Sequence, residues 1–95
     1  MVEAGLGSTE PLLRQRAARL LDFRSPIARE ALIHVVLNDP AARVRREAVH
    51  TLRQHAARSR FGAGDPDTIQ LLEHLQGEPS PAVRHELERL LEVDQ

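Results

Sequence analysis

Two stretches of this chain repeat each other at an interval of about forty residues, and this repetition limits the fold more than any other feature. Residues 39–48 (DPAARVRREA) align with residues 78–87 (EPSPAVRHEL) at an offset of 39. The segments before them align at an offset of 40, where Pro26 matches Pro66. Repeats of this length are typical of stacked helical units, none of which buries its apolar face alone.

Capping residues and prolines divide the chain into five predicted helices, over residues 10–23, 26–38, 40–59, 66–76 and 81–93. Each predicted helix follows a side chain that accepts hydrogen bonds from the first turn, with a proline close behind it. These pairs are Thr9 with Pro11, Ser25 with Pro26, Asp39 with Pro40, Asp65 with Pro66, and Ser80 with Pro81. No segment alternates apolar and polar residues as a half-buried strand would.

The first predicted helix resembles the second half of the repeat, since Leu13 to Ala17 match Val44 to Ala48. The chain therefore divides into an extended or disordered N-terminus (1–8) and one domain (9–95). That domain holds a half repeat (9–24) and two full repeats (25–60 and 65–95). The residues expected to form its core are Ile27, Leu32, Val35, Val44, Ala48, Leu52, Leu72, Leu75, Val83, Leu87 and Leu90.

Composition excludes several classes of protein. A chain of 95 residues without cysteine has neither disulfides nor thiolate metal sites. No apolar run approaches the ~20 residues that span a membrane, and residues 1–8 lack the features of a signal peptide. These observations predict a cytoplasmic protein that is not embedded in a membrane.

The pattern Asp-Pro-x-x-x-Val-Arg-x-x-Ala at residues 39–48, with its copy at 78–87, resembles the signature of HEAT repeats. The likeness is to the short bacterial and archaeal type first noted in phycobilisome lyases. It implies an all-α, short right-handed α-solenoid of about five helices that serves protein binding or as a scaffold. It further implies structural roles for Arg45 with Asp39 and for Arg84 with Glu78, because the Val-Arg arginine of that family bonds to the acidic turn.

No combination of residues predicts catalysis, a metal site or a cofactor. His50 and His55 are five residues apart, whereas helical ligand pairs are three or four apart. His85-Glu86 resembles the ligand pairs of deoxyhypusine hydroxylase, a HEAT-repeat enzyme, but that site needs several pairs and this chain has one. The serines near the predicted helix starts are explained as caps, so we expect a protein that is not an enzyme and holds neither metal nor cofactor.

Charge is distributed unevenly along the chain. Residues 1–61 hold 11 Arg and 6 acidic residues, whereas residues 62–95 hold 2 Arg and 8 acidic residues. In the third predicted helix, cationic or titratable side chains recur at spacings of 3, 4 and 3 and form a basic stripe: Arg43, Arg46, His50 and Arg53. By the resemblance, the stripe lies on the concave surface, flanked by Arg19 on one side and Arg89 on the other.

The basic stripe has two explanations. It is either a solvated face that keeps the helix soluble or a binding site for an anionic partner. For a binding site, the first hypothesis is a protein-interaction module with an acidic protein partner. The second is binding of nucleic acid through its phosphate backbone, against which stand a pI near 6.5 and only two aromatic residues. Self-association is a further outcome, because the acidic C-terminal third complements the stripe.

Overall fold

The computed structural model describes residues 9–20, 26–54 and 64–91, and these ranges contain five helices and no strand. The helices are α2 (Pro11–Leu20), α3 (Pro26–Asn38), α4 (Ala42–Gln54), α5 (Pro66–Gly77) and α6 (Pro81–Leu91). The prediction of an all-α solenoid of about five helices is confirmed. The expected N-terminal segment 1–8, the cap at Ser25, the connection at 59–63 and the helix ends predicted at 21–23, 55–59 and 92–93 lie outside the described residues.

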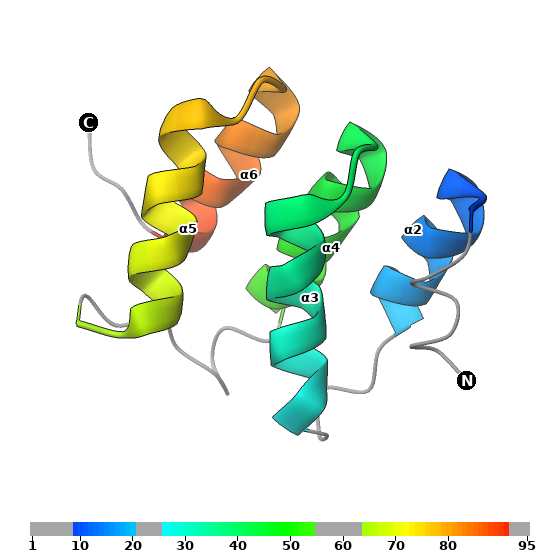
Figure 1. The fold of residues 1–95 in the computed structure, drawn as a ribbon, viewed down its shortest axis with the longest axis horizontal. Helices are drawn as coiled ribbons and strands as arrows, with labels where there is room; N and C mark the ends of the chain where they lie inside the picture. Colours follow the sequence, from blue (N-terminus) through cyan, green and yellow to red (C-terminus); the bar gives the residue numbers. More distant parts are fainter. Residues whose placement is uncertain (1–8, 21–25, 55–63, 92–95) are drawn as a thin grey trace.

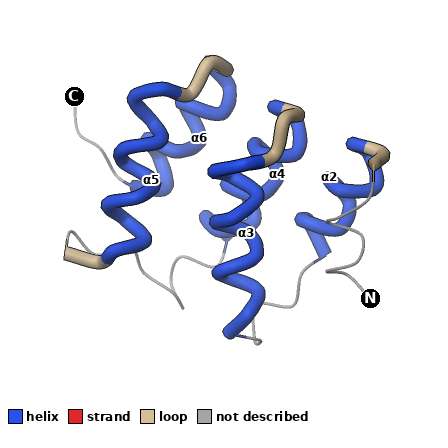
Figure 2. Tube along the Cα trace, in the orientation of Figure 1, coloured by secondary structure: helices blue, strands red, loops and turns tan. Residues whose placement is uncertain are grey.

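The helices stack in two rows (Figure 1). One row consists of α2, α4 and α6, and the other consists of α3 and α5. Each helix of the second row is joined by a short connection to its partner in the first, so that α3 pairs with α4 and α5 with α6 (Figure 2). The central helix is α4, which packs against α2, α3 and α6.

Local hydrogen bonds explain where the helices begin. Asp65 caps α5 by accepting a hydrogen bond from the Asp67 amide at 2.9 Å, and the Ser80 hydroxyl caps α6 by accepting from the Val83 amide at 3.3 Å. In both helices the proline that follows the cap occupies the first helical position, where no N–H group is needed.

Two predicted helix starts differ from the structure. The helix expected to begin at residue 40 begins at Ala42, because the Ala41 carbonyl accepts the first helical hydrogen bonds, from Val44 and Arg45 at 3.1 Å. The carboxylate of Asp39 instead accepts a hydrogen bond from the Ala41 amide at 2.9 Å. At α2, the Glu10 carbonyl, rather than a group of Thr9, accepts the first main-chain bonds.

The core runs through both rows and is built from aliphatic side chains. Eight of the eleven predicted core residues are at most 6% exposed: Leu32, Val35, Val44, Ala48, Leu52, Val83, Leu87 and Leu90. The prediction was wrong for Ile27, which is 59% exposed because it shares its face of α3 with the exposed side chains of Glu30, His34 and Asn38.

On α5 one of the two predicted core residues, Leu72, is displaced by one position. Leu71 is fully buried and Thr68 is nearly so, whereas Leu72 and Leu75 are only partly buried. Thr68, Leu71 and Leu75 follow each other at spacings of three and four, so they form the face that meets α3 and α6.

Candidate functional site

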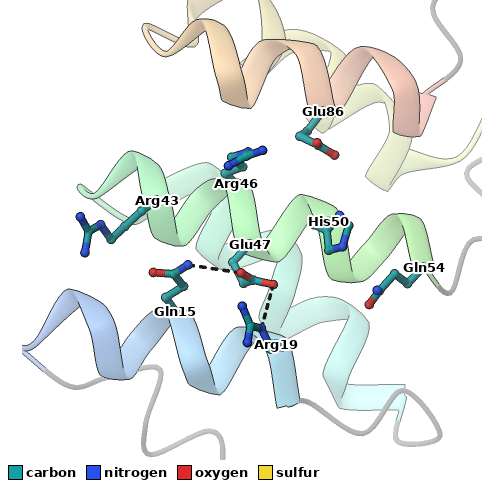
Figure 3. A pocket seen from close by; sticks show the side chains of 8 residues that line it. All are labelled: Gln15, Arg19, Arg43, Arg46, Glu47, His50, Gln54 and Glu86. Atoms are coloured by element: carbon teal, nitrogen blue, oxygen red, sulfur yellow. Dashed lines mark hydrogen bonds and ion pairs between the residues drawn. The ribbon is translucent and has the colours of Figure 1, made fainter.

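The row of α2, α4 and α6 encloses a groove of about 380 Å³ on the side of these helices away from their core contacts. We call it the inner groove. Its lining comes mostly from α4, with two side chains from α2 and one from α6 (Figure 3). The residues are Gln15, Arg19, Arg43, Arg46, Glu47, His50, Gln54 and Glu86. Three of the four residues of the basic stripe line this groove from α4: Arg43, Arg46 and His50. Their spacing of three and four residues predicts that they share one face of the helix.

Two glutamates lie among the cations of the inner groove. Glu47 accepts a hydrogen bond from the amide of Gln15 at 3.3 Å and forms an ion pair with Arg19 at 3.6 Å. Glu86 reaches from α6 to Arg53 of α4, whose Nη1 donates to it at 2.8 Å. These pairs join α2 to α4 and α4 to α6, so part of the groove's charge is already neutralised across the helix junctions.

Arg43, Arg46 and His50 remain as the exposed cationic or titratable groups of the stripe. Within the described ranges none of the three forms an ion pair. Figure 3 shows the side chain of Arg46 directed toward α6 and that of Arg43 directed away from the other labelled side chains. An incoming anion can therefore bind these two guanidinium groups without first breaking an internal contact.

The other predicted contact residues are placed differently. Arg53 is only 29% exposed in its side chain and is bound to Glu86, so it is an inter-helix contact rather than a solvated side chain. Arg89 is exposed on α6 but does not line the inner groove. Sequence reasoning overlooked Glu86 as a groove residue, although its alignment with Glu47 at the repeat offset of 39 carried that information.

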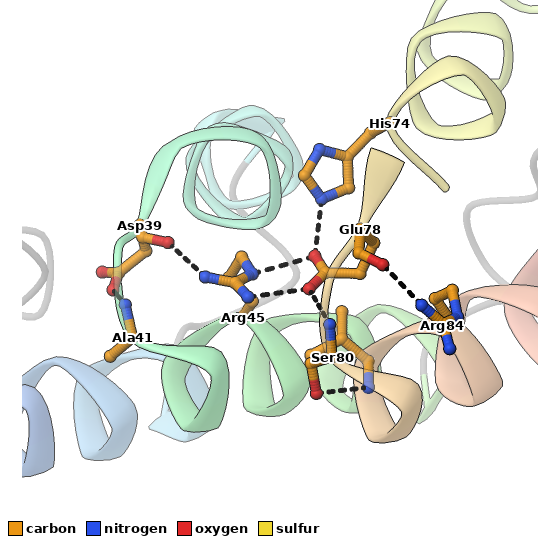
Figure 4. Close-up of polar contacts among 8 residues, drawn as sticks. Asp39, Ala41, Arg45, His74, Glu78, Ser80 and Arg84 are labelled. Carbon is orange, nitrogen blue, oxygen red and sulfur yellow. Dashed lines mark hydrogen bonds and ion pairs between the residues drawn. The ribbon is translucent and has the colours of Figure 1, made fainter. Parts of the chain in front are cut away.

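A second polar centre lies between the helix pairs and is almost completely buried. Glu78 has a side-chain exposure of 0% and Arg45 of 9%. The Arg45 guanidinium donates to both carboxylate oxygens, from Nε at 2.9 Å and from Nη2 at 2.7 Å. His74 approaches Oε1 at 2.7 Å, and the Ser80 amide donates to Oε2 at 3.0 Å (Figure 4). Each oxygen of the buried carboxylate therefore has two hydrogen-bond partners.

Opposing effects determine the ionisation of Glu78. Burial by itself raises the pKa of a carboxyl group, because it penalises the charged form. The hydrogen bonds from Arg45, from the Ser80 amide and from His74 favour the charged form and outweigh burial, so the pKa of Glu78 lies below its ordinary value. Glu78 is therefore a carboxylate at neutral pH and neutralises the charge of Arg45.

The same contact recurs one repeat earlier. Arg14 of α2 donates to Asp39 from Nε at 2.8 Å and from Nη2 at 3.2 Å. Each acidic turn thus binds the arginine of the preceding repeat through its carboxylate. The arginine of its own repeat reaches the turn through the main chain, from Arg45 Nη1 to the Asp39 carbonyl at 2.8 Å and from Arg84 Nη1 to the Glu78 carbonyl at 2.9 Å. The pairing of Arg45 with Asp39 and of Arg84 with Glu78 therefore exists, but through carbonyl groups.

The described residues offer no group of three or more His, Cys, Asp and Glu side chains suited to a metal ion. Of the His85-Glu86 pair, the glutamate is bound to Arg53 and the histidine is exposed. The expectation that the chain holds no metal or cofactor stays a prediction. Among the helices of the described ranges, none has the length and apolar character needed to cross a membrane.

Comparison with known proteins gives one match. The family model of HEAT repeats matches residues 2–92, nearly the whole chain. No curated protein and no solved structure matches the sequence.

Proposed function

The chain belongs to the HEAT repeat family, and from this premise we propose that it is a non-catalytic protein-interaction module whose contact surface is the inner groove. HEAT repeats generally mediate protein–protein interaction or scaffolding, and solenoids use their extended inner surfaces for binding. The observation that carries the proposal is the pair of exposed guanidinium groups, Arg43 and Arg46, on the groove side of the central helix. We also propose a likeness to phycobilisome-lyase-type HEAT proteins, because residues 39–48 and 78–87 carry that motif, and a cytoplasmic location, because the sequence has no cysteine.

The charges of the groove favour an acidic protein segment as its occupant. Three arginines and two glutamates line it, and Arg19 is already paired with Glu47. A short segment with one or two carboxylates needs only Arg43 and Arg46 as partners, and it can also hydrogen-bond to Gln54. Arginine binds carboxylates through two parallel hydrogen bonds, which adds specificity to the attraction.

Nucleic acid is the second candidate, because the same two arginines suit phosphate oxygens. Duplex DNA carries a charge about every 1.7 Å along its axis, so its binders neutralise many phosphates with many cations. Glu47 and Glu86 would lie close to a polyanion that filled this groove and would repel it. The acidic lining therefore ranks nucleic acid below an acidic protein.

The test replaces both exposed arginines, in the variant Arg43→Glu, Arg46→Glu. Binding of a fluorescent peptide that carries two glutamates and of a single-stranded oligonucleotide of equal charge is measured at low and moderate salt. We expect the wild type to bind the peptide, and the variant to lose at least about tenfold in affinity. The melting temperature should stay nearly unchanged, because both side chains are exposed.

The matched control compares Arg46→Glu with Arg16→Glu, which makes the same charge change on α2 outside the inner groove. Equal losses in the two variants would show a nonspecific charge effect and contradict the proposal. Tighter binding of the oligonucleotide than of the peptide, with a steep salt dependence, would establish the second candidate instead. Capture from lysate with and without nuclease then identifies natural partners.

A further inference from the structure

Two of the three leucines of α2, Leu13 and Leu20, are exposed at positions that the other repeats bury. Leu13 aligns with Val44 and Val83, which are both 0% exposed, yet Leu13 is 51% exposed. Leu12 and Leu20, on the same side of α2, are 62% and 61% exposed. We call these three side chains the α2 apolar face. It contains three of the five large hydrophobic residues that are most exposed in the described ranges.

The repeat architecture explains why this face is uncovered. Val44 is buried where α3 packs on α4, and Val83 is buried where α5 packs on α6. The neighbour of α2 in the structure is α4, which covers the opposite side of the helix at Ala17 and Ala18. Within the described ranges α2 has no helix that corresponds to α3 or α5. Leu13 therefore lies where the first helix of a pair packs in the other repeats, and Leu12 lies beside it at a position that is exposed in each repeat.

The shape and charge of this region narrow the choice of occupant. Leu12 and Leu13 line a hollow of about 420 Å³ together with Gln15, Arg16 and Arg19. Arg16 lies four residues after Leu12 and four before Leu20, so it projects from the middle of the apolar face. The ten residues of α2 contain three arginines and no acidic residue. Among described residues Arg16 has no ion-pair partner.

We propose that the α2 apolar face binds an amphipathic helix of a partner protein, with an apolar stripe that packs on the three leucines and an acidic residue that pairs with Arg16. The bound helix occupies the position of the first helix of a pair and completes the half repeat. Binding of an amphipathic helix in an apolar groove is a common mode of peptide recognition. The hollow adjoins the inner groove, because Gln15 and Arg19 line both, but the leucines and Arg16 do not line that groove.

Two other occupants fit the face less well. A second copy that docked its own α2 apolar face would bring Arg16 and Arg19 of both copies together, which is unfavourable. An anionic membrane suits a basic helix with exposed leucines, but a bilayer accepts protruding side chains, whereas Leu12 and Leu13 line a hollow. A helix fills such a hollow with its own ridge of side chains.

The probe is a synthetic helical peptide with leucines at alternating spacings of three and four residues and glutamates on both sides of that stripe. Its binding to the full chain is measured by fluorescence anisotropy, and its site is mapped by amide chemical shifts. We expect shifts concentrated in residues 11–20. The variant Leu12→Ser, Leu13→Ser should lose about tenfold or more in affinity with little change in melting temperature, because both side chains are exposed.

Controls separate this face from other surfaces. Ile69→Ser removes an exposed apolar side chain of α5 and should leave peptide affinity unchanged. A peptide with lysine in place of glutamate should bind more weakly to the wild type, and Arg16→Glu should reverse that preference. Shifts centred on residues 43–50, or full affinity in the leucine variant, overturn the proposal.

The remaining outcomes also decide the occupant. Absence of peptide binding up to about 1 mM overturns the proposal. If a chain without residues 1–8 binds the peptide about tenfold more tightly than the full chain, the face belongs to the chain's own N-terminus and the proposal is wrong. Concentration-dependent dimers that Leu12→Ser, Leu13→Ser abolishes assign the face to a second copy. Binding to phosphatidylserine vesicles that the same variant abolishes, without peptide binding, assigns it to a membrane.

Discussion

The replacement Glu78→Gln should destabilise the protein far more than its small chemical change suggests. Both carboxylate oxygens accept two hydrogen bonds, and Arg45 donates to each of them. In either orientation of the glutamine amide, its NH₂ group faces two of these donors. The guanidinium of Arg45, which is only 9% exposed, loses its counter-charge. Removal of one member of a buried ion pair costs about 3–5 kcal/mol.

That loss is large for a domain of this size. A chain of 95 residues has an unfolding free energy of about 5–14 kcal/mol at typical values per residue. The variant should therefore lose at least about a fifth of its stability, and its melting temperature should fall by at least about 12 °C. Urea unfolding followed by far-ultraviolet circular dichroism measures the free energy, and an unchanged m-value shows that the folded state is as compact as before.

The matched control is Glu86→Gln, the same substitution in an ion pair between α4 and α6 that is more exposed. Glu86 accepts one hydrogen bond, from Arg53, and the two side chains are 13% and 29% exposed. We expect a loss of about 0–1 kcal/mol. The double variant Arg45→Met, Glu78→Gln should recover part of the stability lost in Glu78→Gln, because it removes the unpaired charge. Equal stabilities of Glu78→Gln and Glu86→Gln would refute this account of the junction.

Three further predictions concern stability. Because the pKa of Glu78 is lowered in the folded state, its ionised form stabilises the fold at every pH above the ordinary glutamate pKa of about 4.3. This contribution should be lost as the pH falls from that value toward the pKa of the folded state. Measurement of the unfolding free energy during an acid titration should show a smaller loss in Glu78→Gln than in the wild type. The Thr51 hydroxyl is buried and has no hydrogen-bond partner among the described residues. Thr51→Val should therefore raise stability by about 1 kcal/mol in urea unfolding, and a loss would show that the hydroxyl is satisfied. Asp39→Ala should cost about 2–4 kcal/mol by the same assay, because it removes both hydrogen bonds that the carboxylate accepts from the largely buried Arg14 and the one it accepts from the Ala41 amide; a loss below that of Glu86→Gln would contradict this.

The helices and their repetition were predictable because the information is local. Prolines and capping side chains act within one helical turn, so Pro66 and Pro81 mark the starts of α5 and α6 without reference to the rest of the fold. The apolar spacing within each helix likewise indicated most of the buried side chains. It failed at Ile27, which is 59% exposed. The prediction followed the apolar residues next to Ile27 in sequence, although the residues on the same face of the helix are polar.

The contacts of charged side chains were less predictable, because they depend on how one helix pair sits on the next. Arg53 was expected to be solvated and is bound to Glu86 from another helix. Arg43 and Arg46 have the same residue type and a similar place on the helix, but no acidic side chain reaches them from the neighbouring helices of the described structure. Only the arrangement of α2, α4 and α6 separates structural arginines from those open to a partner.

The sequence by itself determined the repeat, the all-helical class and the positions of the acidic turns, since each depends on interactions within a few residues. Tertiary structure alone decided that the carboxylate of Glu78 binds Arg45 of the preceding repeat while Arg84 of its own repeat binds its carbonyl. It also decided that Leu13 is exposed although its counterparts Val44 and Val83 are buried. The physical reason is the same in both cases: burial and ion pairing depend on which helix lies alongside, and the residues of one repeat do not encode the presence of the next.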